Sequence, residues 1–471
     1  MAYTGISQLA LGNYLTIAFI EGVHKNISVA YPEWEMVDRM RVGSVDGREA
    51  RYLLQKSLGP SAVQYRNPGV RSEFPAGQES SIQEGTIQYK ELDATIELEY
   101  NLYRRILESK SKYDASALAM EVDSKITSLK RQISLDFYGD GTGCLGRIAS
   151  AALVSASLAA PGSAPASYNV AVVTLRQLDT DQGFAGCFQF DEQVKHYAAA
   201  GTSGSAVTTV SGTFAYWKVV ARDPRSATNT VTLVACDSSG NYLSVSSPSG
   251  WTPTAGEAFY KLGQPTVPNL TSVADYGTVT EVITGLDSLI SADGRTVNGI
   301  SMLGAVQGTV YDNGGSVIDV NAIEQAMNQV KNAVGEGRYS WKQALCNRET
   351  RSAFIDSRET DRRFISSTDN KRGVATFSYI HQDDSIELKG SEFCNFKRMY
   401  ILPEGKNEGQ KVLQFRGTDF KPARAENGDV FMFAPGTAGY HKRLMVSYMN
   451  GMGQLVNLHP AGCVKISNFS L

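Results

Sequence analysis

One long helical period constrains the fold of this chain more than any other feature. It begins at Asp114, which can cap a helix, and continues for roughly six turns. Apolar side chains recur at every third or fourth position: Ala115, Leu118, Ala119, Val122, Ile126, Leu129, Ile133 and Phe137. Polar residues occupy the opposite face. This is the longest helical signal in the chain, and it predicts a helix over 114–138.

The predicted helix runs directly into a glycine-rich stretch, "FYGDGTGCLG". Gly141, Gly143 and Gly146 have the G-x-G-x-x-G spacing of dinucleotide-binding loops, which need a buried strand before the first glycine and a helix after the last. Here a helix comes first. We therefore expect the glycines to end the helix, with Gly139 as a left-handed cap and Asp140-Gly141 as a turn. The predicted helix-terminating hinge consists of Gly139, Asp140, Gly141 and Gly143.

Before the helix, the chain shows extended patterns. Residues 1–60 have no sustained helical period, and we interpret them as an arm that contacts neighbouring subunits through Tyr14, Phe19, Tyr31 and Trp34. Residues 61–101 predict a long β-hairpin. Its second strand alternates apolar and polar residues, which predicts a ribbon with one apolar face. We expect that face to contact another subunit through Leu92, Ala94, Ile96, Leu98 and Tyr100.

After the glycines, the composition changes twice. Residues 160–270 are rich in Ser, Thr, Gly, Ala and Val, with short strand patterns separated by turns, which predicts a small all-β domain. The rest is mixed α/β. It includes an amphipathic helix ending at Gly335 and a last hairpin with Asn450-Gly451 as its two-residue turn.

Composition excludes several classes of function. Apolar residues make up 42% of the 471 residues, charged residues 20%, and the net charge is −3, which indicates a globular chain without a general attraction for nucleic acid. Six widely spaced cysteines and five scattered histidines form no metal or nucleophile–base motif. We expect no secretion signal, no membrane span, and thiols that are reduced in a cytoplasm. The sequence predicts no enzyme, no cofactor and no metal.

The order of these parts resembles the major capsid proteins of tailed double-stranded-DNA bacteriophages, which have the Hong Kong 97-type fold. "ISLDFYGDGTGCLGRI" resembles the segment that closes the spine helix in such coats, and "VITGLDSLIS" followed by "NGI" fits as well. The resemblance covers most of the chain. The β-rich module departs from the minimal fold and is similar to β-domains inserted in some of these coats.

This resemblance implies an α+β Hong Kong 97-type fold plus an inserted all-β domain. The implied segments are an amino-terminal arm (1–60), an extended β-hairpin loop (61–101), the spine helix with the first part of the peripheral domain (102–159), the inserted domain (160–270), a mixed α/β axial domain (271–400) and C-terminal strands (401–471).

The resemblance also implies a function. The chain would self-assemble as pentamers and hexamers into the icosahedral shell of a virion, in the host cytoplasm, and enclose double-stranded DNA without sequence-specific binding. Portal and scaffolding proteins are implied partners, and a decoration protein is a further one. The alternatives are an encapsulin-type shell without DNA, or a tail-tube or decoration protein of the virion.

Overall fold

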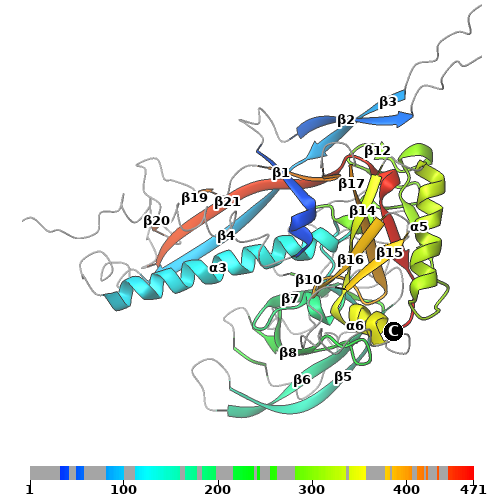
Figure 1. Ribbon diagram of the computed structural model, residues 1–471. Helices are drawn as coiled ribbons and strands as arrows, with labels where there is room; N and C mark the ends of the chain where they lie inside the picture. Colours follow the sequence, from blue (N-terminus) through cyan, green and yellow to red (C-terminus); the bar gives the residue numbers. More distant parts are fainter. Residues whose placement is uncertain are drawn as a thin grey trace, which may run out of the picture.

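The structure of the chain is a computed structural model. It describes residues 32–41, 49–57, 81–99, 112–159, 165–177, 183–197, 216–237, 241–243, 255–261, 282–335, 339–356, 377–381, 384–405, 411–417, 421–422, 432–433 and 444–471. These residues form a mixed α/β structure. Figure 1 shows a long helix beside a long pair of strands, a barrel below the end of that helix, and a second large sheet flanked by helices.

The long helix is α3 (Lys112–Tyr138), which measures about 40 Å at 1.5 Å per residue. Its C-terminal half is buried, with Leu129, Ile133 and Phe137 in the first hydrophobic core. The short 3₁₀ helix η1 (Pro32–Met36) packs on the same core, where the Trp34 indole donates a hydrogen bond of 3.0 Å to Ser134 Oγ. Trp34 therefore belongs to the core of its own chain, and its expected role as a contact to a neighbour is wrong.

The first large sheet is organised by one long strand, β21 (Leu444–Asn457). It pairs antiparallel with β4 (Lys90–Glu99) from Leu444 to Gly453. It also pairs with β18 (Leu413–Gly417), β19 (Lys421–Pro422) and β20 (Met432–Phe433), and β1 (Val37–Arg41) adds in parallel to β18.

The continuity of β21 corrects the predicted hairpin at Asn450-Gly451. Both residues lie inside the strand, where Asn450 pairs with Asp93 and Gly451 with Leu92. Turn formation was predicted from two local residues, but the ladder with β4 holds the chain extended through them.

The extended ribbon also lies earlier than expected. β2 (Glu49–Ser57) pairs antiparallel with β3 (Ser81–Gln88), so the ribbon includes part of the predicted arm. β4 does not belong to it, because its partner is β21. The alternation in β4 revealed a half-buried strand but not its partner, which comes from the far end of the chain.

A closed six-stranded barrel follows α3, in the order β10-β5-β6-β9-β8-β7. Its strands are β5 (Gly146–Ala159), β6 (Pro165–Leu175), β7 (Gln193–Tyr197), β8 (Tyr216–Asp223), β9 (Thr230–Cys236) and β10 (Ala258–Lys261). It has its own hydrophobic core, which includes Trp217, Phe259 and Leu233. The predicted boundary at residue 160 is therefore too late. β5 is rich in Ala and Ser, which have low strand propensity, yet it pairs with β6 from Ile148 to Ala159.

Two arginines hold the barrel against α3. Arg131 of α3 and Arg222 of β8 both donate to the carbonyl oxygens of Gly186 and Phe188, at distances of 2.6 to 3.0 Å. These carbonyls flank the short 3₁₀ helix η2 (Ala185–Cys187). The carbonyl oxygens of Gly186 and Phe188 therefore accept hydrogen bonds from both arginines, and these bonds connect α3 to the barrel.

The second large sheet has the order β13-β22-β17-β14-β16-β15. Its strands are β13 (Thr309–Asp312), β14 (Tyr339–Asn347), β15 (Phe377–His381), β16 (Asp384–Ser391), β17 (Arg398–Gly405) and β22 (Val464–Ser467). Helix α5 (Val320–Val334) covers it through Ile323, Met327 and Val330. Asp319 caps α5 by accepting from Ala322 N, and Gly335 ends it with φ of 87°. That agrees with the predicted helix end.

Short elements complete the description: α4 (Leu286–Leu289), β11 (Thr296–Val297), β12 (Ile300–Ser301), η4 (Gly304–Val306), α6 (Arg348–Asp356) and η7 (Pro460–Gly462). All six cysteines are free, and five of them are buried.

Candidate functional site: the junction at the end of the long helix

The glycine-rich stretch turns the chain out of α3. The helix ends at Tyr138, and Gly141 and Gly143 have φ angles of 89° and 77°, a region that side chains with a Cβ disfavour. Gly139 does not have a positive φ, so the expected left-handed cap at that residue is wrong. Asp140 Oδ1 accepts hydrogen bonds from Thr142 N (2.8 Å) and Thr142 Oγ1 (2.6 Å), which closes a tight turn.

This turn is not a phosphate-binding loop. Helix α3 precedes it and strand β5 follows it, the reverse of the strand-then-helix order that aims backbone N–H groups at a phosphate. Gly146 is the first residue of β5 and pairs with Phe259 of the barrel. The glycines direct the chain from the helix into the barrel.

The segment 282–290 closes over the end of α3. Val282 N donates to Gly141 O (3.0 Å), and Ser288 Oγ donates to Asp140 O (2.8 Å). Gly285 permits this approach: a Cβ there would lie 2.3 Å from Asp136 O and 2.5 Å from Phe137 O. Both contacts are with backbone, so a side chain would force the two elements apart.

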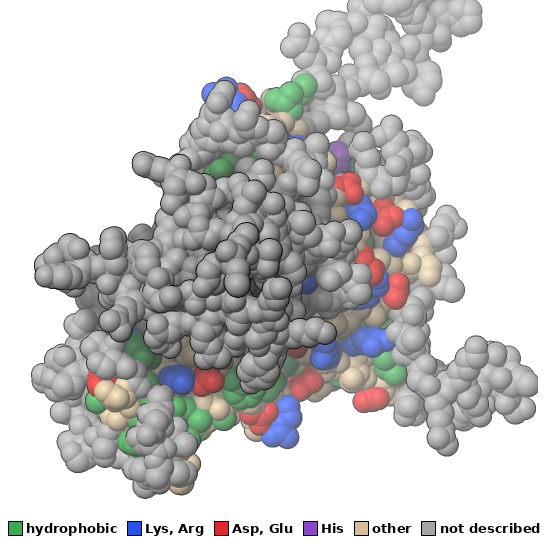
Figure 2. All heavy atoms as spheres, turned by 90° about the vertical axis from the view of Figure 1, so that its left-hand side faces the viewer, with side chains coloured by type: hydrophobic (Ala, Val, Ile, Leu, Met, Phe, Trp, Pro, Cys, Tyr) green, Lys and Arg blue, Asp and Glu red, His purple; other side chains and the backbone are tan. Residues whose placement is uncertain are grey.

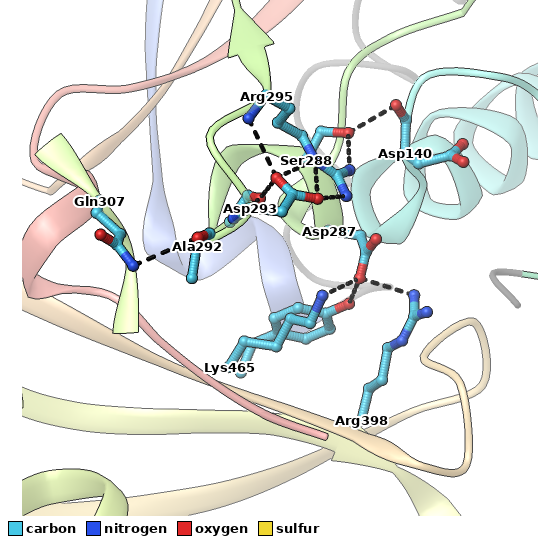
Figure 3. A network of polar contacts seen from close by, with 11 residues as sticks. Asp140, Asp287, Ser288, Ala292, Asp293, Arg295, Gln307, Arg398 and Lys465 are labelled. Carbon is cyan, nitrogen blue, oxygen red and sulfur yellow. Dashed lines mark hydrogen bonds and ion pairs between the residues drawn. The ribbon is translucent and has the colours of Figure 1, made fainter. Parts of the chain in front are cut away.

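Asp287 connects this segment to the second large sheet (Figure 3). Its buried Oδ1 accepts from Arg398 Nη1 (2.7 Å), Lys465 Nζ (2.9 Å) and Tyr400 OH (3.2 Å). Burial acts to raise the pKa of Asp287, but the Arg398 and Lys465 charges outweigh it and hold that pKa below the usual range. The Asp287 carboxylate is therefore ionised, and the positive charges of Arg398 and Lys465 balance it.

A second ion pair stabilises the loop after α4. Arg295 Nε donates to both carboxylate oxygens of Asp293 at 2.9 Å, and Gln307 Nε2 donates to Ala292 O at 3.4 Å (Figure 3). Burial acts against the charged form of Asp293, but the hydrogen bond from Arg295 outweighs it and lowers the pKa of Asp293 to about 2. In this network the carboxylates of Asp287 and Asp293 each have a cationic partner.

The other predicted contact residues are placed as follows. Leu92 is partly buried against the first core of its own chain, and Ala94, Ile96 and Leu98 lie in β4 with their backbones paired to β21. The side chains of Ala94, Ile96 and Leu98 lie outside the described residues, as do Tyr14, Phe19, Tyr31 and Tyr100.

Sequence patterns did not predict the residues that meet the hinge from the other side: Gly285, Asp287, Arg398 and Lys465. A signal was present, because "VITGLDSLIS" places one acidic residue in an otherwise apolar run. A single buried carboxylate implies a cationic partner, but sequence spacing does not identify Arg398 and Lys465 as those partners.

Within the described part of the chain, no group of three or more His, Cys, Asp or Glu side chains could hold a metal ion. A helix long and apolar enough to span a bilayer is likewise not found among the described helices. On the face shown in Figure 2, basic and acidic side chains of the described residues are interspersed and not separated by sign.

No protein-family model matches the sequence, and no curated protein does. The structure is similar to solved structures at low identity. It matches the cyanophage A-1(L) capsid asymmetric unit with 9% identity and a TM-score of 0.44, over 94% of this chain and 93% of that chain. The capsid of a native GTA particle matches with 10% identity and a TM-score of 0.42, over 94% and 91%. The SrpI encapsulin of Synechococcus elongatus PCC 7942 matches with 14% identity and a TM-score of 0.23, over 40% and 56%.

Proposed function

We propose that this chain is a major capsid protein, which self-assembles into the icosahedral shell around the double-stranded DNA of a tailed bacteriophage. The observation that carries the proposal is the outer face of the β2–β3 ribbon. Its inner face anchors the ribbon, because Tyr52, Leu54 and Ile87 are buried with Val456 of β21. Its outer face displays two large apolar side chains, Leu53 and Ile82, which are 70% and 59% exposed.

These two side chains share one face of the ribbon. Leu53 lies opposite Glu84, and Ile82 lies two residues before Glu84 on β3, so residues 51 and 53 of β2 and residues 82, 84 and 86 of β3 point the same way. Arg51 and Glu84 form an exposed ion pair beside them, at 3.2 Å. Apolar side chains held on an anchored ribbon and rimmed by charges are typical of a protein contact.

The shape of the subunit supports the same function. Helix α3 and the β4–β21 pair extend together away from the second large sheet (Figure 1). An elongated subunit can lie across several neighbours and bury more area with them than a compact one of equal mass. The interspersed surface charges and the net charge of −3 suit a shell that encloses DNA without binding its sequence.

The remaining assignments follow from this function. Copies of the chain form pentamers and hexamers, with portal and scaffolding proteins as partners, and the shell is assembled in the host cytoplasm. The barrel formed by residues 146–261 is an inserted domain that projects from the shell, where a decoration protein can reach it. The chain has no catalytic role.

Electron microscopy of the purified protein tests the proposal. The wild type should form closed shells. The double variant Leu53→Asp/Ile82→Asp should keep the circular dichroism spectrum of the wild type but remain as subunits or capsomers. Val154→Asp is the matched control, since Val154 is 42% exposed on the barrel, and it should still form shells.

Three results would count against parts of the proposal. Normal shells from the ribbon variant would support a shell-forming function but would show that the outer face of the ribbon is not an assembly contact. A wild type that never forms shells, but gains thermal stability with ATP or NAD, would favour a nucleotide-binding protein. Closed shells that exclude DNA when they are produced with the other phage components would favour the encapsulin-type alternative.

A further inference from the structure

Two arginines at the junction between α3 and the barrel lie side by side. Arg131 Nη2 and Arg222 Nη1 donate to the same two carbonyl oxygens, those of Gly186 and Phe188, at 2.6 to 3.0 Å. Because both nitrogens bond to the same oxygen atoms, they are separated by no more than the length of two hydrogen bonds. Two positive charges at such a short separation repel each other.

No carboxylate of the described residues forms an ion pair with either arginine. The two carbonyl oxygens that accept their hydrogen bonds are neutral. By contrast, Arg295 and Arg398 each pair with an aspartate. Burial and the charge of Arg131 lower the pKa of Arg222, which is the effect expected where one cation lies beside another. The pair therefore lacks an anion in direct contact.

Two glutamates are near enough to raise the pKa of Arg222, but neither is bonded to it. Glu192 is engaged elsewhere: its Oε1 lies 2.7 Å from Lys261 Nζ, and its Oε2 accepts from Gln189 N at 2.9 Å. The Glu392 carboxylate has neither a hydrogen bond nor an ion pair with the part of the chain that the structure describes. These acids balance the arginine charges only from a distance.

Each guanidinium group keeps N–H donors that are open to solvent. A guanidinium has five N–H groups, and the bonds to the carbonyls use one nitrogen of each arginine. The other nitrogens of Arg131 and Arg222 make no hydrogen bond with the described residues, and none of them is a buried atom without a partner. They therefore reach the surface, where an anion can approach them.

Aromatic rings hold both guanidinium groups in place. Arg131 Cζ lies 5.3 Å from the centroid of the Phe393 ring, and Arg222 Cζ lies 5.6 Å from that of Phe190. Phe190 is 57% exposed, so the Arg222 side of the pair lies at the surface of the barrel. The rings and the carbonyls orient the donors before a ligand arrives, which lowers the entropic cost of binding.

We propose that Arg131 and Arg222 form a binding site for a free oxyanion of the phosphate type. A guanidinium presents parallel N–H groups that match two oxygens of such an anion, and two adjacent guanidinium groups balance a double negative charge. The bound anion would cancel the repulsion between the arginines and stabilise the contact between α3 and the barrel. This inference does not depend on the proposed capsid function.

Thermal unfolding of unassembled subunits with inorganic phosphate tests binding. At pH 8 and constant ionic strength, phosphate should raise the midpoint temperature in a saturable manner, whereas the chloride that it replaces should not. Arg222→Gln removes one of the two charges and should weaken the apparent affinity about tenfold or more. Arg225→Gln is the matched control, since Arg225 is an exposed arginine of the same barrel that pairs with Asp223, and it should leave the affinity unchanged.

Two further variants keep the test decisive if Arg222→Gln loosens the junction. Arg222→Lys keeps the charge but loses the planar fork, and it should also weaken phosphate binding in isothermal titration calorimetry. Glu392→Gln removes a negative charge that opposes the anion, so it should bind phosphate more tightly than the wild type. A purely structural role of the arginines does not produce that gain.

Three results would overturn the proposal. The first is the absence of saturable stabilisation of the wild type by phosphate. The second is an equal affinity of the wild type and Arg222→Gln. The third is a stabilisation that rises without saturation and equally in all variants, because that is the general effect of phosphate and sulfate on folded proteins.

Discussion

The Asp287 cluster allows a prediction whose size follows from its geometry. Asp287 and Arg398 are 3% and 2% exposed, and one carboxylate oxygen serves Arg398, Lys465 and Tyr400. Asp287→Asn keeps the shape of the side chain but removes the negative charge. It leaves the buried guanidinium of Arg398 and the ammonium of Lys465 without their counter-charge.

Breaking a buried ion pair from one side costs about 3–5 kcal/mol, because the remaining charge stays desolvated. A domain is stable by only about 5–15 kcal/mol, so this loss is a large fraction of the total. The folded-state pKa of Asp287 lies below its usual value, so its contribution is present above the unfolded pKa of about 3.9 and is lost as the pH falls through the folded-state value. The cost of Asp287→Asn should therefore be the same at pH 6 and pH 8.

Urea unfolding of unassembled subunits, followed by circular dichroism, measures this cost. A double-mutant cycle with Arg398→Met should show strong coupling, since removing both charges restores part of the stability. Glu404→Gln is the control: it breaks the exposed pair between Lys342 and Glu404 (2.6 Å) and should cost less than about 1 kcal/mol. A cost below about 1 kcal/mol for Asp287→Asn, or additive costs in the cycle, would refute the electrostatic account.

Two further predictions concern the same junction. Gly285→Ala should destabilise the subunit by about 1–3 kcal/mol, because its Cβ would lie 2.3 Å from Asp136 O. Gly139→Ala is the control, since its Cβ would lie 3.3 Å from the same oxygen, and it should cost clearly less in the same urea titration. Equal costs would show that the close approach is not limiting. Burial raises the pKa values of Glu33 and Asp136 to about 7, so each favours folding when protonated and loses that contribution as the pH rises through about 7. Relative to the wild type, Glu33→Gln and Asp136→Asn should therefore gain thermal stability from pH 5 to pH 8, and a difference that is constant with pH would contradict this reasoning.

Sequence patterns predicted the elements whose cause is local. The period from Ala115 to Phe137 gave helix α3 nearly to the residue, since the observed helix starts at Lys112 and ends at Tyr138. The predicted end of α5 at Gly335 is also confirmed, because a glycine with a positive φ acts within one turn, whereas the cap at Asp319 was not predicted. The hinge glycines were found, although the positive φ angles lie at Gly141 and Gly143 and not at Gly139.

Sequence patterns did not predict correctly the features that depend on residues far away in the chain. The alternation of apolar and polar residues in β4 does not show that β21 is its partner. The sequence of β5 has a low strand propensity, and its pairing with β6 in the barrel is what makes it a strand. Trp34 was assigned to a neighbour because its segment has no period, yet its indole is bound by Ser134, a hundred residues away. Asp287 stood out in its apolar run, but its partners Arg398 and Lys465 come from other elements.

Strand β21 has a consequence for synthesis of the chain on the ribosome. β4 ends at residue 99, whereas the strand that completes it begins at residue 444. At about 5–20 residues per second, the ribosome needs roughly 20–70 s to make the intervening chain. During that time β4 has no β21 to pair with, and the barrel can close long before the first sheet can form. The nascent chain therefore carries an unpaired strand edge through most of its translation, which predicts that a chaperone present during synthesis will raise the yield of soluble subunits more than one added afterwards.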